Sequence, residues 1–330
     1  MARTLLRVKI TVLGPGAWGT ALAKLAHEGG HEITLWGRAE RLAKIADSHQ
    51  NADYLPGIEL PTNWTLEADI QRAISHAEGI ILAVPSSFFR EVASQITGFK
   101  GITVSVTKGI EHETGLTMAG ILEEITSEAP IVALSGPSLA FEVARGIPTG
   151  LVCASTNEDA AKTVQDWFHR PPLRMYTSSD VHGVELGGAL KNVMAIAAGV
   201  CDGLKMGDNA KAALITRGLN EMMRLGTAAG AEAATFYGLS GMGDLTVTCF
   251  SQQSRNRTLG ERIAKGESLE KVLASATAEG YPTVKSAKAL AGKLEVNTPI
   301  IDEVYAMLYE GKDVKQAVTD LTTRIPKSEN

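Results

Sequence analysis

The sequence has few cysteines, no excess of positive charge and no uninterrupted apolar run of membrane length. Its three cysteines, Cys153, Cys201 and Cys249, are far apart and form neither a metal-type pair nor a disulfide framework, so we expect reduced, mostly buried thiols. A formal net charge of −5 argues against a general nucleic-acid surface. The sequence therefore indicates no metal site, no nucleic-acid partner and no membrane span.

The first residues, MARTLLRVKITVLG, have the arginines and the short apolar stretch of a signal peptide. They run directly into a glycine turn, however, with no cleavage-like site between. We interpret this stretch as a first β-strand and expect a cytoplasmic protein.

The chain is long enough for two domains. Its 330 residues exceed what one core usually organises, and 44% apolar with 21% charged residues is typical of a globular protein. We predict a dinucleotide-binding domain over residues 1–182 and an α-helical substrate-binding domain over residues 183–330. The turn-like stretch at residues 169–180 would form the boundary.

The first half alternates short apolar runs with helix-length segments such as 16–29 and 86–97. This alternation predicts an α/β fold with a Rossmann-like, doubly wound parallel sheet. The expected strands are 8–13, 32–36, 79–84, 102–106, 131–134 and 150–153.

From about Val184 the chain becomes rich in alanine and glycine, with no strand pattern in view. A long helix there opens an all-α C-terminal domain. Further helices are expected at 209–226, 269–276, 284–293 and 300–308. The apolar content of the last of these is compatible with a homodimer, but the sequence leaves the oligomeric state open.

The stretch VLGPGAWG contains Gly14, Gly16 and Gly19 in the spacing of a dinucleotide-binding loop. It follows a predicted strand and opens a predicted helix, the context that gives the motif its meaning. Gly14 would form the tight turn, Gly16 would let a pyrophosphate approach the backbone, and Gly19 would let the helix pack on the strand. An ordinary glycine-rich turn is the alternative.

Arg38 stands at the end of the second predicted strand, where an acidic residue would favour NAD. An arginine there can instead pair with the 2′-phosphate of NADP. The position favours NADP(H) as cofactor and leaves NAD(H) open, and a solvated loop cation is the alternative.

Two further stretches follow predicted strands. Lys108, in VTKGIE, comes just after the fourth strand, and Gly136, Pro137 and Ser138 follow the fifth. Both would lie at the carboxyl edge of the sheet, where open α/β sheets bind ligands. Plain turns explain these residues equally well.

The segment GALKNVMAIAAG places Lys191 and Asn192 at the head of an apolar helix. A partly desolvated lysine is suited to act as an acid or base. From spacing alone, a surface lysine that extends its amine to water is the better-supported interpretation.

The stretch GMGDLTVTCFSQQSRNRTLG combines acidic, hydroxyl, amide and guanidinium groups. Arginine beside amide and hydroxyl donors suits a phosphate. A polar loop between helices is the alternative. The residues concerned are Asp244, Thr248, Ser254, Arg255, Asn256 and Arg257.

Taken together, these stretches resemble the NAD(P)-dependent glycerol-3-phosphate dehydrogenase family of the bacterial type. The resemblance rests on an ordered set that covers nearly the whole chain: GPGAWGTALA, LAVPS, TKGIE, LSGPS, GALKNVMAIAAG, GLSGMGDLTVTC, SRNRTLG and TPIIDEVYAMLYEGK. It implies a Rossmann-like domain followed by a helical substrate domain. The implied activity is reversible hydride transfer between NAD(P)H and dihydroxyacetone phosphate, giving sn-glycerol 3-phosphate for glycerophospholipid synthesis.

The resemblance also implies roles for residues. Lys191 matches the catalytic proton donor and acceptor, Lys108 matches a second lysine shared by substrate and cofactor, and Asp244 matches a group that orients the catalytic lysine. The implied substrate contacts are Lys108, Gly136, Ser138, Lys191, Asn192, Asp244, Thr248, Ser254, Arg255 and Asn256. The glycine loop and the resemblance together imply cofactor contacts from Gly14, Gly16, Ala17, Trp18, Gly19, Arg38, Lys108, Ala140, Arg255 and Glu279.

Three positions depart from the family pattern. Pro15 removes one N–H from the glycine loop, but the usual anion contacts come from later amides. Leu139 and Phe141 replace what are more commonly Phe and Lys, which puts in doubt only local packing and one surface charge.

Two other functions stay open on sequence grounds. A related reductase could act on another 2-oxo or β-hydroxy acid, such as ketopantoate, although we do not expect the SRNR stretch in such an enzyme. A dinucleotide sensor could keep the fold without the chemistry, against which the two lysines and Asp244 argue.

Overall fold

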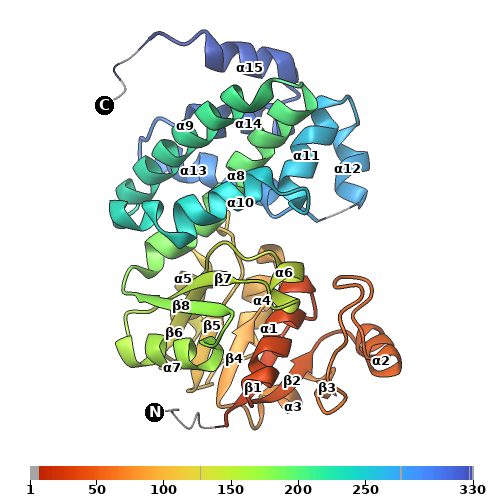
Figure 1. The fold of residues 1–330 in the computed structure, drawn as a ribbon. Helices are drawn as coiled ribbons and strands as arrows, with labels where there is room; N and C mark the ends of the chain where they lie inside the picture. Colours follow the sequence, from red (N-terminus) through yellow and green to blue (C-terminus); the bar gives the residue numbers. More distant parts are fainter. Residues whose placement is uncertain (1–6, 127, 276, 327, 329–330) are drawn as a thin grey trace. The chain divides into compact units, whose positions relative to one another are not determined.

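A computed structural model describes the chain except for residues 1–6, 127, 276, 327 and 329–330 (Figure 1). The described chain forms two compact units. The first contains residues up to Lys108 together with Leu116–Glu185, and the second contains Gly109–Gly115 together with the residues from Leu186 onward. The predicted division after residue 182 falls, like this one, within helix α8 (Val181–Gly203).

The first unit is built on an eight-stranded sheet with the order β3-β2-β1-β4-β5-β6-β7-β8. Neighbouring strands run parallel except β6 and β7, which are antiparallel. Between β1 and β4 the winding reverses direction, which is where doubly wound sheets bind ligands. The strands are β1 (Lys9–Leu13), β2 (Glu32–Trp36), β3 (Thr65–Glu67), β4 (Gly79–Leu82), β5 (Ile102–Ser105), β6 (Ile131–Ser135), β7 (Thr149–Ala154) and β8 (Leu173–Ser178).

The central strands are buried on both faces, which explains their continuous apolar sequences. In β4, Ile81 packs into one core and Ile80 and Leu82 pack into another. The helices of this unit are α1 (Ala17–Glu28), α2 (Ala39–Ser48), α3 (Ile70–Ile74), α4 (Phe89–Ser94), α5 (Met118–Ile125), α6 (Ala140–Ala144) and α7 (Glu158–Phe168). The Rossmann-like α/β class predicted from the alternation is therefore confirmed.

Two strands were not predicted, and the stretch expected to be a turn at residues 169–180 is largely a strand. β3 has only three residues, too few for a periodic signal. β8 occupies the stretch expected to be a domain-boundary turn, and its residues alternate between buried Leu173 and Met175 and exposed Arg174 and Tyr176. That alternation is the pattern of a strand with one covered face. The helix expected at 86–97 is also shorter, since residues 86–88 form a 3-10 turn before α4.

The second unit is helical in its described part and encloses its own apolar core. Its helices after α8 are α9 (Gly207–Ala228), α10 (Asp244–Phe250), α11 (Arg255–Ala264), α12 (Leu269–Ser275), α13 (Gly280–Lys293), α14 (Pro299–Tyr309) and α15 (Val314–Thr322). The last residue of the helix expected at 269–276 lies outside the described residues. The helices α10, α11 and α15 were not predicted.

Helix α8 corrects the expectation that no run is long enough to span a membrane. Its 23 residues pass that test by length and composition, but its most apolar window is entirely buried in the structure. A buried core helix passes the same test, so this single helix is weak evidence for a membrane span. Glu185, in its second turn, accepts hydrogen bonds from the backbone N–H of Ala119 at the start of α5.

Candidate active site

The glycine loop joins β1 to α1, and its glycines differ in how much space surrounds them. Gly14 has a φ of +116°, and a Cβ on it would lie 2.6 Å from the carbonyl oxygen of Ala83. A Cβ on Gly19 would lie 2.1 Å from the carbonyl oxygen of Gly14 and 2.9 Å from Cβ of Ala83. Ala83 directly follows β4, so both glycines let α1 and the loop close on the two central strands.

Gly16, in contrast, has open space around it. No atom lies within 4 Å of the position its Cβ would take, and it is the N-cap of α1. The free N–H groups of this first turn therefore have room for an anion. This arrangement fits the pyrophosphate of a dinucleotide, and Ala17 and Trp18, the next two residues, belong to the same turn.

Asn51, which the sequence analysis did not identify, holds this loop in place. The buried side chain of Asn51 donates hydrogen bonds of 2.8 Å to the carbonyl oxygen of Pro15 and to Oγ1 of Thr20. It thereby holds both ends of the turn, including the proline that departs from the family pattern. The pairing spans more than thirty positions of sequence and left no local signal.

We expect Gly19→Ala to abolish dinucleotide binding and to destabilise the first unit. The added methyl group meets backbone and Cβ atoms that cannot move without shifting α1, and overpacking of this kind costs about 1–3 kcal/mol or more. Thermal unfolding and NADPH fluorescence titration measure the two effects. Gly30→Ala, at a position with a positive φ but open space, is the control that should retain binding. Full NADPH affinity in Gly19→Ala would contradict this packing argument.

Lys108 and the Gly136 turn come together at the carboxyl edge of the sheet. Nζ of Lys108 donates to the carbonyl oxygen of Gly136 at 3.3 Å, and Oγ of Ser138 donates to the same oxygen at 3.0 Å. Gly136 has a φ of +138°, and a Cβ there would lie 2.9 Å from the carbonyl oxygen of Gly150. These predicted residues form one polar cluster, and Ala140 begins α6 just after them.

Arg38 is the exposed N-cap residue of α2, directly after β2 and Gly37. Within the part of the chain that the structure describes, no ion pair holds its guanidinium. In this fold, the residue at the end of the second strand recognises the 2′-substituent of the adenosine ribose, and a cation at this position suits a 2′-phosphate.

Lys191 is buried, contrary to the surface lysine that spacing alone favoured. Its Nζ donates to Oγ1 of Thr248 at 2.7 Å and lies 3.1 Å from Oδ1 of Asp244. Oγ1 of Thr248 in turn donates to the same Asp244 oxygen at 3.2 Å. The lysine also lies in the third turn of α8 and not at its head, because the helix begins at Val181. A buried amine held by a carboxylate and a hydroxyl is suited to proton transfer.

The helix α10 supplies both partners because Asp244 and Thr248 are one turn apart on one face. A π-helical turn over Leu239–Gly243 precedes it, and α8 approaches this turn closely. A Cβ on Gly187 would lie 2.8 Å from the carbonyl oxygen of Ser240. Gly187 is one turn before Lys191, so this approach sets the lysine against α10.

The start of α11 joins the same cluster through Asn256. Its Nδ2 donates to Oδ1 of Asn192 at 2.8 Å, and its Oδ1 accepts from the N–H of Gly280 at 2.8 Å. Ser254 caps α11, and its hydroxyl accepts from the N–H of Arg257. Arg255 remains exposed in the first turn. Glu279 is the residue before Gly280, at the N-cap of α13.

The stretch proposed as a polar loop or phosphate site is therefore mostly helical. Within the second unit, hydrogen bonds and an ion pair connect Lys191 with Asp244 and Thr248, and a hydrogen bond connects Asn192 with Asn256. Ser254 and Arg255 directly precede Asn256 in the chain, and Glu279 directly precedes Gly280, whose N–H donates to Asn256. The first unit contains two separate groups of predicted residues. One is the glycine loop, and the other is Lys108 with Gly136 and Ser138. Sequence reasoning assigned no role to the ion pairs that Asp202 makes with Arg257 and Lys211.

The cysteines are free and buried, as expected. Cys249 directly follows Thr248, and burial raises the pKa of its thiol to about 12. The thiol of Cys249 therefore stays protonated at neutral pH. Within the described residues no group of His, Cys, Asp and Glu side chains could hold a metal ion.

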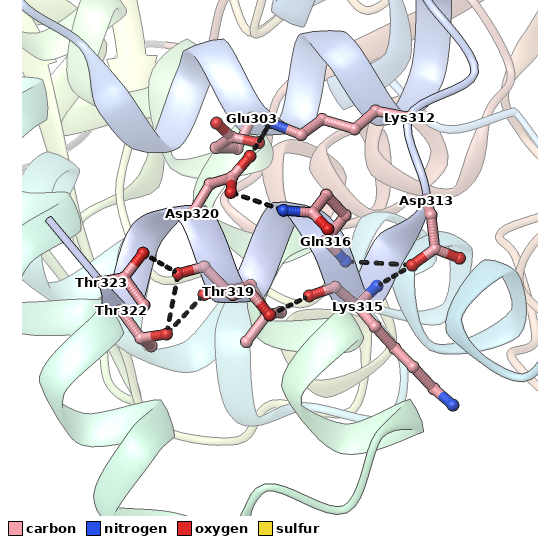
Figure 2. Close-up of polar contacts among 10 residues, drawn as sticks. Glu303, Lys312, Asp313, Lys315, Gln316, Thr319, Asp320, Thr322 and Thr323 are labelled. Carbon is pink, nitrogen blue, oxygen red and sulfur yellow. Dashed lines mark hydrogen bonds and ion pairs between the residues drawn. The ribbon is translucent and has the colours of Figure 1, made fainter.

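A cavity of about 750 Å³ lies elsewhere in the second unit. Apolar side chains of α8, α9, α14 and α15 line it, and none of the predicted site residues does. Helix α15 forms one wall and is held through Lys312, which pairs with Glu303 at 2.5 Å and with Asp320 at 2.6 Å (Figure 2). This cavity is therefore separate from the cluster around Lys191.

Two family models match the chain. The N-terminal domain of NAD-dependent glycerol-3-phosphate dehydrogenase matches residues 9–161, and the C-terminal domain matches residues 180–319. The chain belongs to this family. The resemblance seen in the sequence motifs is thus confirmed over both units.

Individual relatives agree with this assignment. The chain is 46% identical over 331 residues to an NAD(P)+ glycerol-3-phosphate dehydrogenase from Chlorobium phaeobacteroides, covering 98% of this chain and 99% of the relative. It is 44% identical over 330 residues to a glycerol-3-phosphate dehydrogenase of the same name from Listeria innocua, covering 97% and 98%. The crystal structure of glycerol-3-phosphate dehydrogenase from Coxiella burnetii superposes with a TM-score of 0.93 at 35% identity, covering 96% of this chain and 99% of that one.

Proposed function

We propose that this protein catalyses reversible hydride transfer between C4 of NAD(P)H and C2 of dihydroxyacetone phosphate, giving sn-glycerol 3-phosphate. The observation that carries the proposal is the buried Lys191 held by Asp244 and Thr248 in a chain of this family. Its product would supply glycerophospholipid synthesis.

The residues of the first unit would hold the dinucleotide. The amides that follow Gly16 would bind the pyrophosphate, and Arg38 would pair with a 2′-phosphate. When bound, the nicotinamide supplies or accepts the hydride. Trp18, Ala140, Lys108, Arg255 and Glu279 complete the proposed cofactor contacts.

Lys191 would carry the proton. In the reductive direction its Nζ donates a proton to the oxygen at C2 as negative charge develops there, and in the oxidative direction it removes that proton from the hydroxyl. Asp244 and Thr248 keep Nζ at a fixed point, and Lys108 would stabilise the developing charge.

The substrate phosphate would bind at the start of α11. Arg255 is exposed in the first helical turn and offers a planar set of donors to phosphate oxygens. Asn256 has a second amide proton beside the one it gives to Asn192. Holding the substrate in this way contributes several kcal/mol to the lowering of the barrier, on the order of what positioning supplies elsewhere.

The test is an assay of purified protein with NADPH and dihydroxyacetone phosphate, followed by loss of NADPH absorbance. We expect turnover with this substrate and little with ketopantoate or β-hydroxy acids. Preference for one of those acids would support the related reductase instead. Absence of turnover with every substrate, despite NADPH binding, would support the non-catalytic sensor.

Arg38 tests the cofactor preference. We expect Arg38→Ala to raise the KM for NADPH about tenfold or more and to leave the KM for NADH nearly unchanged, because only NADPH has the 2′-phosphate. Initial rates with each cofactor measure this difference. Arg41→Ala, which removes a neighbouring cation stacked on Tyr54, is the matched control. Equal effects on both cofactors would make Arg38 a loop cation only.

We also propose a cytoplasmic location and a homodimeric assembly. The reduced, buried cysteines and the apolar content of the last helices support these proposals. Light scattering after gel filtration would measure the mass in solution, and a monomer would contradict the second proposal.

A further inference from the structure

The two arginines of Ser254–Arg257 have different surroundings. Arg255 is exposed, whereas the side chain of Arg257 is only 10% exposed. Nε of Arg257 lies 2.7 Å from Oδ2 of Asp202, and its Nη2 lies 3.2 Å from Glu261. The guanidinium of Arg257 is therefore engaged by two carboxylates within the protein.

Asp202 binds two cations from different helices. It lies near the end of α8, and its other oxygen lies 2.5 Å from Nζ of Lys211 on α9. The side chain of Lys211 is 9% exposed, and its amine also lies over the ring of Phe250, the last residue of α10. A single carboxylate thus connects α8, α9 and α11 and reaches the end of α10.

The backbones of α8 and α11 touch at the same crossing. A Cβ on Gly199 would lie 1.9 Å from the carbonyl oxygen of Arg257, and a Cβ on Gly260 would lie 1.9 Å from that of Ile196. The glycines fix how closely the helices approach, but they have no side chain to fix rotation or sliding. The ion pair of 2.7 Å between Asp202 and Arg257 joins the two helices by their side chains at this crossing and opposes such movement.

We propose that Asp202 is a positioning residue that, through Arg257, fixes the first turn of α11, and with it Arg255, for binding of the substrate phosphate. The proposal rests on the proposed function, since it concerns the same phosphate site. It assigns Arg255 to the ligand and Arg257 to the scaffold. Without the Asp202 carboxylate, Arg257 and Lys211 would be two mostly buried cations without their shared partner, and α11 would shift.

The experiment compares wild type with Asp202→Asn and measures KM for dihydroxyacetone phosphate, kcat, KM for NADPH and inhibition by inorganic phosphate. We expect the KM for dihydroxyacetone phosphate and the inhibition constant for phosphate to rise together, by about tenfold or more. The kcat should stay within about threefold of wild type, because Lys191 is held by Asp244 and Thr248. The KM for NADPH should rise less than the KM for dihydroxyacetone phosphate, because most of the proposed cofactor contacts belong to the first unit. A general loss of structure would not separate these constants.

Glu303→Gln is the matched control. It removes a carboxylate of similar burial that also pairs with a lysine, Lys312, but it lies on α14, which carries no predicted site residue (Figure 2). We expect it to lower the melting temperature without changing the kinetic constants. Asp202→Glu restores the charge and should recover most of the phosphate affinity; it also serves as the test if Asp202→Asn fails to fold.

The proposal is overturned if folded Asp202→Asn binds phosphate and substrate like wild type. It is also overturned if Asp202→Asn or Asp202→Glu lowers every kinetic constant in the same proportion. A wild type that is inert with dihydroxyacetone phosphate would instead overturn the proposed function. In that case calorimetric titration of wild type and Asp202→Asn with inorganic phosphate still decides the role of Asp202.

Discussion

Lys191→Met should lower kcat by about 10²–10⁴-fold, the range typical of losing a positioned general acid or base. Methionine keeps the apolar stem of the lysine but has no proton to give. Binding of NADPH should be retained, because the glycine loop that would hold it belongs to the other unit. Turnover assays and NADPH fluorescence titration measure the two properties separately.

A stability effect accompanies this change and must be separated from the chemistry. Removing the lysine leaves the carboxylate of Asp244, whose side chain is 3% exposed, without its cation. Breaking a buried ion pair in this way costs about 3–5 kcal/mol. The double variant Lys191→Met/Asp244→Asn also removes the negative charge of the carboxylate, so it should regain much of the stability and none of the turnover.

The control is Lys288→Met, which removes an exposed lysine paired with Asp302 on the surface of α13 and α14. Exposed pairs contribute about 0–1 kcal/mol, and we expect neither activity nor stability to change measurably. If the double variant recovered turnover along with stability, Lys191 would be a structural residue.

Arg255→Ala should lower kcat/KM for dihydroxyacetone phosphate by about 30–1,000-fold, which corresponds to losing roughly 2–4 kcal/mol of charge-assisted contact with the phosphate. The exposed guanidinium in the first turn of α11 is the group proposed to bind the phosphate directly. Unphosphorylated dihydroxyacetone gains nothing from Arg255. The preference of wild type for the phosphorylated substrate should therefore collapse in the variant.

Arg262→Ala provides the comparison for Arg255. This arginine lies in the last turn of the same helix and pairs with Glu267. Its loss changes the net charge of α11 equally but should leave the discrimination between the two substrates intact. Equal losses in both variants would mean that general electrostatic attraction, and not a specific contact, accounts for phosphate recognition.

The sheet could be predicted from sequence largely because its central strands are buried on both faces. Burial on both sides leaves continuous apolar runs, as in Gly79–Leu82, and glycines at the switch point leave a spaced motif. The short β3 and the one-sided β8 leave neither signal. The helices α10 and α11 were missed because the stretch that contains them is rich in polar residues, which is typical of a loop between helices.

The candidate site, too, could be predicted only in part from the sequence. Motifs located the residues, but only the fold could show which of them are buried and paired. The local sequence around Lys191 favours a surface amine. Its burial depends on contacts with Asp244 and Thr248, which lie more than fifty positions later in the chain. Asn51 contacts Pro15 and Asp202 contacts Arg257, both far away in sequence, and neither Asn51 nor Asp202 stands in a motif that spacing could identify.

The central claim is that the buried Lys191 carries the proton in reduction of dihydroxyacetone phosphate. The most direct measurement is the rate of NADPH oxidation with this substrate, made on wild type and on Lys191→Met at equal occupancy by cofactor. We expect rapid turnover by wild type and a loss of about two orders of magnitude or more in the variant. Comparable rates in the two proteins would contradict the claim.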